Sequence, residues 1–88
     1  AKGAYNAAKT KELRAAAKPG VKAQVCKKIL GKPKRTHKEA SCRPSFKSED
    51  GVLAGEGTEY LYTYAHVKLY TYKPPKSKQH YVVVVEPA

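Results

Sequence analysis

The chain has 88 residues, so residues 1–88 are expected to form one small domain with a limited hydrophobic core. Its 18 Lys and Arg against seven Asp and Glu give a formal net charge of +11, which favours anionic partners. No apolar run approaches the roughly 18 residues that a membrane-spanning helix needs, so we expect no transmembrane segment.

The N-terminal half is rich in Ala and Lys and predicts two short helices. Residues 5–17 are strong helix formers, and Pro19 and Gly20 must interrupt this helix because proline lacks an N–H donor and glycine relaxes the backbone. A second helix is expected over residues 21–30, where apolar residues recur every four positions. Residues 32–38 contain no apolar side chain and are interpreted as a solvated loop.

The C-terminal half predicts an antiparallel sheet. Polar and apolar residues alternate over residues 60–64 and 67–72, which indicates a hairpin that turns near residues 65–66. The valine-rich residues 80–86 form another strand, and an irregular earlier strand is expected within residues 42–53. Helices followed by strands predict an α+β fold. In this fold an N-terminal helix, interrupted at Pro19 and Gly20, packs on an antiparallel sheet of about four strands.

Two cysteines, Cys26 and Cys42, enclose fifteen intervening residues. A bridge across such a loop stabilises a small domain by about 3 kcal/mol. Small extracellular domains use disulfides in this way. The sequence therefore predicts a disulfide between the second helix and the start of the sheet, and a secreted protein.

The sequence lacks a recognisable catalytic or metal-binding motif. The histidines, His37, His66 and His80, are far apart and lack the spacing of a helical metal site, and the cysteines form no CxxC pair. Nothing matches a P-loop, a dinucleotide fingerprint or a nucleophile elbow. We therefore expect no enzyme, no cofactor and no metal, but a protein that acts by binding another macromolecule.

A first binding signal comes from two short apolar segments. Residues 52–54 are apolar and flanked by Gly51 and Gly55, and Pro74 and Pro75 form a second rigid turn. Buried between strands, the first segment would be an ordinary bend. Exposed at a hairpin tip beside the second, it would form a wedge that loses little conformational entropy on binding.

This arrangement resembles the cystatin superfamily, over about half of the chain from Phe46 to Val85. Gly51-Val52-Leu53-Ala54-Gly55 follows Lys47-Ser48 and precedes a tyrosine strand, as in the first inhibitory hairpin of stefins. Residues 59–65 are similar to the corresponding strand of monellin-like members, and the two prolines fall where the second hairpin loop should be. The resemblance implies a helix gripped by an antiparallel sheet, and inhibition of a papain-like cysteine protease. The residues that it assigns to the wedge are Gly3, Val52, Leu53, Ala54, Gly55, Pro74 and Pro75.

A second binding signal is the set of tyrosines with basic neighbours. A three-residue loop at residues 65–67 would place five tyrosines on one face, whereas a two-residue loop would separate them. On one exposed face the tyrosine rings would stack with bases or sugars, and each stacked base would contribute about 1–3 kcal/mol to binding. On the face toward the helix the rings would belong to the hydrophobic core, and this is the arrangement that we expect. The alternative function is therefore a module binding nucleic acid or acidic polysaccharide, or an antimicrobial host-defence protein acting on anionic surfaces. The residues of this alternative surface are Lys32, Lys34, Arg35, Lys38, Tyr60, Tyr62, Tyr64, Lys68, Tyr70 and Tyr72.

Overall fold

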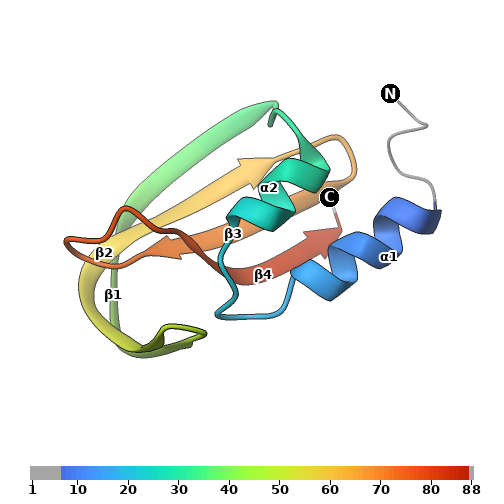
Figure 1. The fold of residues 1–88 in the computed structure, drawn as a ribbon. Coiled ribbons are helices and arrows are strands. Elements are labelled where there is room, and N and C mark those ends of the chain that lie inside the picture. Colours follow the sequence, from blue (N-terminus) through green and yellow to red (C-terminus); the bar gives the residue numbers. More distant parts are fainter. Residues whose placement is uncertain (1–6, 88) are drawn as a thin grey trace.

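Two short helices precede an antiparallel sheet in the computed structural model, which describes residues 7–87 (Figure 1). The sheet has four strands in the order β1-β2-β3-β4. The predicted α+β class is confirmed at this level, whereas Gly3 and the first residues of the predicted helix lie outside the described residues. The elements are α1 (Ala7–Ala16), α2 (Gln24–Leu30), β1 (Arg35–Ser48), β2 (Gly51–Thr63), β3 (Val67–Lys73) and β4 (Tyr81–Pro87).

The main core lies between the helices and one face of the sheet. Leu13 of α1 and Cys26 of α2 pack against the sheet. Their partners are Tyr62 of β2, Leu69 of β3 and Val82 of β4. These strand residues share one face because side chains alternate along a strand. The helices supply small and aliphatic residues to this face, and the expected packing of helix on sheet is confirmed.

The residues between the two helices pair with the outer edge of β4. The N–H of Gly20 donates to the carbonyl of Val82, and the N–H of Ala23 donates to the carbonyl of His80, each at 2.8 Å. Residues 20–23 therefore behave as a short additional strand, and α2 begins at Gln24, later than predicted, because this pairing holds the preceding backbone extended.

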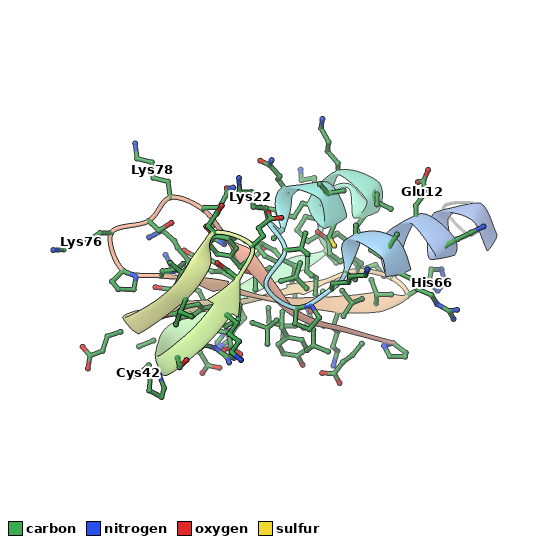
Figure 2. The ribbon with its side chains drawn as sticks, turned by 60° about the horizontal axis from the view of Figure 1, so that its bottom comes forward. Glu12, Lys22, Cys42, His66, Lys76 and Lys78 are labelled. Carbon is green, nitrogen blue, oxygen red and sulfur yellow. The ribbon has the colours of Figure 1, made fainter. Side chains whose placement is uncertain are left out.

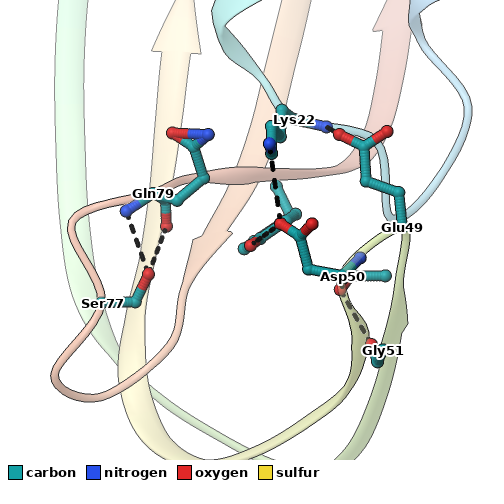
Figure 3. A network of polar contacts seen from close by, with 8 residues as sticks. Lys22, Glu49, Asp50, Gly51, Ser77 and Gln79 are labelled. Carbon is teal, nitrogen blue, oxygen red and sulfur yellow. Dashed lines mark hydrogen bonds and ion pairs between the residues drawn. The ribbon is translucent and has the colours of Figure 1, made fainter.

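The tip of the β1–β2 hairpin closes onto the same linker (Figure 3). The N–H of Glu49 donates to the carbonyl of Gly20 at 3.0 Å, and the Tyr81 hydroxyl donates to the Asp50 carboxylate at 2.5 Å. Gly20 has a φ of 88°, and a Cβ there would overlap the carbonyl oxygen of Lys47. Only glycine fits this junction, because other residues avoid such a φ and the neighbouring backbone leaves no room.

A second, smaller core lies on the face of the sheet that points away from the helices. Phe46, Tyr72 and Tyr81 are buried together, with Leu53 packed against them. The register of β1 on β2 shifts between Arg43 and Phe46, which marks a bulge. Bulges bend and twist a strand, so this one lets the hairpin curl over the aromatic rings.

Two predictions about this region are wrong. Residues 32–38 were predicted as a loop, but β1 begins at Arg35 and continues to Ser48. Its side chains are mostly exposed because β1 is an edge strand, and the polarity of an edge strand looks like that of a loop. Residues 51–55 are not a hairpin tip, because the turn is at residues 49–50 and β2 starts at Gly51.

The hairpin between β2 and β3 confirms the predicted turn and decides between the two arrangements of tyrosines. Thr63 pairs with Lys68, so the loop has two residues, Ala65 and His66. Tyr60, Tyr62 and Tyr64 therefore share the helix face, whereas Tyr70 and Tyr72 face the other way. Tyr62, Tyr64 and Tyr72 are buried, which confirms core packing and rules out a single stacking platform of five rings.

The predicted disulfide is absent, and both cysteines are free. Cys26 is buried beneath the helices, where its thiol donates to the carbonyl of Ala16 at 3.2 Å, and burial raises its pKa to about 11. Cys42 is exposed on β1, opposite Glu56 of β2. One thiol therefore lies inside the helix–sheet core and the other on the surface of the edge strand. The expectation of secretion, which rested on this bridge, stays a prediction.

Candidate functional site

Basic side chains gather where the chain enters the sheet. The N–H of Lys34 donates to the carbonyl of Thr63 at 2.7 Å, which fixes the loop before β1 against the end of β2. In the next position Arg35 pairs with Thr63, which itself pairs with Lys68 of β3. Arg35 and Lys68 therefore project from the same face of three adjacent strands, on either side of a threonine.

A hollow of about 430 Å³ opens between these side chains. Its floor includes Leu61 and Thr63 of β2, and cationic or titratable groups stand on both sides. A phosphate or sulfate group in this hollow would meet the Arg35 guanidinium and the Lys68 ammonium, and the fork of a guanidinium matches such oxygens in pairs. The lining residues are Arg35, Thr36, His37, Leu61, Thr63 and Lys68.

The opposite face of β1 is also basic. Lys38 pairs with Tyr60 on the helix side of the sheet, and Lys27 of α2 places its ammonium 4.7 Å from the centre of the Tyr62 ring. The α2–β1 loop adds further exposed lysines. We name the whole set the basic edge: Lys27, Lys28, Lys32, Lys34, Arg35, Lys38 and Lys68.

The acidic side chains do not neutralise the basic edge. Within residues 7–87 only two ion pairs form, between Lys22 and Asp50 and between Arg43 and Glu59. Glu49 accepts the N–H of Lys22 at 3.0 Å, so the hairpin acids hold the linker (Figure 3). Among the described side chains no cation of the basic edge forms an ion pair, although Glu86 of β4 lies opposite Lys68 in the strand pairing.

The residues of the predicted wedge are only partly brought together. Val52 is 65% exposed, close to the hairpin tip, but Leu53 packs into the second core. Gly55 has a φ of 125°, and a Cβ there would lie 3.0 Å from the ring of Pro75. The glycine segment and the proline turn therefore do meet, whereas Leu53 points inward. Ala54 lies in β2 and Pro74 is buried, while Gly3 is outside the described residues.

Sequence reasoning missed the part of the hollow that β1 provides. Thr36 and His37 were not selected, because the basic run was interpreted as a loop without defined faces, and Leu61 and Thr63 of β2 were not selected either. Residues 35–39 are all polar, so they show no alternation of apolar and polar side chains that would have indicated a strand.

Two other classes of site are not found in the described part of the chain. No group of three or more His, Cys, Asp or Glu side chains is placed to hold a metal ion between residues 7 and 87. None of the helices there has the length and apolarity to cross a bilayer. A comparison with models of protein families, with curated proteins and with solved structures finds no match to this chain.

His80 is the one histidine that the fold encloses, where the β3–β4 loop joins β4. Its ring centre lies 4.5 Å from that of Tyr60, and its Nδ1 is 3.4 Å from the Thr71 hydroxyl. Burial lowers the pKa of His80, and the charges of Lys27 and Lys73 lower it further. The neutral ring is thus the form that the folded protein prefers.

This preference predicts a loss of stability in mild acid. Because the folded pKa of His80 is below the unfolded value of about 6.5, its contribution is complete above that pH and is lost as the pH falls through and below it. Urea unfolding followed by circular dichroism on both sides of this pH should show the decrease. A His80→Gln variant should show a smaller decrease, and an unchanged pH profile in that variant would contradict the assignment.

Proposed function

We propose that this protein binds nucleic acid through the phosphate backbone, using the basic edge. The observation that carries the proposal is the row of Arg35 and Lys68 beside a hollow, where neither cation forms an ion pair among the described residues, although Glu86 is the strand partner of Lys68. A net charge of +11 adds a long-range field that steers polyanions toward the molecule. Each phosphate that meets a cation releases counterions, which supplies the free energy of binding.

The geometry supports contact with the backbone more than with the bases. Tyr62, Tyr64 and Tyr72 are buried, so their rings are not offered to successive bases. Tyr60 and Tyr70 are half-buried and lie on opposite faces of the sheet. Because phosphate contacts position a nucleic acid without reading its sequence, we expect weak discrimination between sequences.

Binding should weaken steeply with salt. If about five cations of the basic edge bind phosphates of a duplex, the logarithm of the affinity falls with the logarithm of salt with a slope of about −4.5, which is a loss of roughly 500-fold between about 50 and 200 mM. The triple variant Lys34→Gln, Arg35→Gln, Lys38→Gln should lower the magnitude of this slope by about three. Fluorescence anisotropy of a labelled DNA duplex measures both.

The matched control changes the same number of charges elsewhere. Lys11→Gln, Lys76→Gln, Lys78→Gln alters exposed lysines of α1 and of the β3–β4 loop, and Lys76 and Lys78 lie at the other end of the molecule from His66 (Figure 2). Equal salt-dependence slopes for the two triple variants would show that binding depends only on net charge. This result would contradict the proposal that the basic edge is the binding site. Tighter binding of heparin than of DNA at the same salt concentration would assign the edge to an acidic polysaccharide instead.

Inhibition of a papain-like cysteine protease is a second candidate, which rests on the approach of Gly55 to Pro75. This contact places the glycine segment and the proline turn side by side, as the resemblance to cystatins implies. The inhibitory surface would then be formed by Val52, Gly55 and Pro75, because Leu53 supports the second core from below. A cystatin-like relationship is part of this proposal.

The exposed valine provides the test of inhibition. Val52→Glu should abolish inhibition of papain while leaving the circular dichroism spectrum unchanged, because the charge is solvated in the free protein and would be buried unpaired in the complex. Val25→Glu makes the same change on α2, where the side chain is 46% exposed, and should still inhibit. Absence of inhibition by the unmodified protein, or full inhibition by Val52→Glu, would contradict this candidate.

A further inference from the structure

The outer edge of β4 is only partly covered. Residues 20–23 pair with its beginning, through Lys22 opposite Tyr81 and through two hydrogen bonds of 2.8 Å between Val82 and the linker. From Val83 onward, no strand within residues 7–87 pairs with that edge. An open edge presents backbone donors and acceptors that a further strand can use.

An apolar hollow of about 460 Å³ lies beside this open edge. It is bounded by α1, by the residues that follow α1, by the β2–β3 turn and by the end of β4. Most of its lining is aliphatic, and Val84 next to it is 39% exposed in a strand of four consecutive valines. The apolar side chains that line the hollow include Leu13, Ala17, Pro19, Val84 and Val85.

The charge distribution identifies what fits there. β4 contains no Lys or Arg, although the chain carries 18 of them, so two copies that meet along β4 experience less repulsion than along β1. Arg14 and Glu86 both line the hollow and carry opposite charges. In an antiparallel pair with a twofold axis near Val85, the side chain of Val85 meets the partner's Val85 on the helix side of the sheet, beside the hollow, and the partner's Glu86 lies opposite Val84 on the other side. The surface is self-complementary, as a twofold interface requires.

We propose that two copies of this chain associate through antiparallel pairing of their β4 edges, residues 83–87, which joins the two sheets into one. The exposed valine of each copy is covered, and the hollow beside α1 receives side chains of the partner's strand. Because β1 and β4 are the two outer strands of the sheet, the joined sheet keeps a basic edge at each end. The dimer does not depend on the proposed nucleic-acid binding, and it is tested without any ligand.

Sedimentation equilibrium from micromolar to millimolar concentration measures the association. We expect a monomer–dimer equilibrium for the unmodified protein. Val84→Glu should weaken the dimer by about a hundredfold or more, because each new carboxylate would lie directly opposite the partner's Glu86, so that the interface would hold two like-charged pairs. Val25→Glu, which makes the same change at an exposed position of α2, should dimerise as the unmodified protein does. Circular dichroism confirms that both variants fold.

Three results would overturn the proposal. One is a monomer at every concentration; another is a dimer that Val84→Glu does not weaken. The third is a monomer that binds a synthetic peptide of the sequence YVVVVEP, because this would assign the edge to extended peptides and not to self-association. Hydrogen exchange adds a direct readout, since the dimer should protect amides of residues 83–87 in proportion to its population.

Discussion

The backbone of four residues, 20–23, holds the two sides of the structure together. On one side its peptide groups extend the sheet beyond β4, and on the other the carbonyl of Gly20 receives the N–H of Glu49 from the tip of the β1–β2 hairpin. The linker also connects the helices, so its position places α1 and α2 over the same face. With a Cβ at Gly20 excluded by the Lys47 carbonyl, one glycine sets how closely the hairpin approaches.

This closure explains how so small a chain maintains two separate cores. The helices cover Tyr62 and Leu69 on one face, and the curled hairpin covers Tyr72 and Tyr81 on the other. Tyr81 links both features, because its ring is in the second core while its hydroxyl donates to Asp50 at the hairpin tip. Burial, and then that hydrogen bond, raise the pKa of Tyr81 to about 12, so the phenol stays protonated.

The same closure separates the functional surfaces. Acids near the linker are engaged with Lys22 and Tyr81, and the cations at the start of β1 form no ion pair among the described residues. Across the sheet Arg43 of β1 forms an ion pair with Glu59 of β2, and a basic outer strand stands at one side with a valine-rich outer strand without Lys or Arg at the other. The two proposals use these two strands, with the proposed polyanion site at β1 and the proposed self-association at β4.

Local patterns predicted the elements that depend on local sequence. Alternation fixed β2 and β3 around Ala65 and His66, and the break at Pro19 ended the first helix near its observed limit. Features that depend on distant partners were missed: the linker pairs with β4 because of an edge far along the chain, and Cys26 is separated from Cys42 by the packing of α2. The site was half predicted, since Arg35 and Lys68 were selected but the start of β1, which places Arg35 beside Thr63 of β2, was interpreted as a loop.

Native-state hydrogen exchange tests the closure most directly. The amides of Gly20, Ala23 and Glu49 donate to backbone carbonyls across the junction, although all three lie outside the regular strands. If the closure supports the whole fold, these amides exchange only through global unfolding, with the same free energy as amides in the middle of β3. Exchange of the three amides at rates typical of exposed loops, while β3 stays protected, would contradict this account.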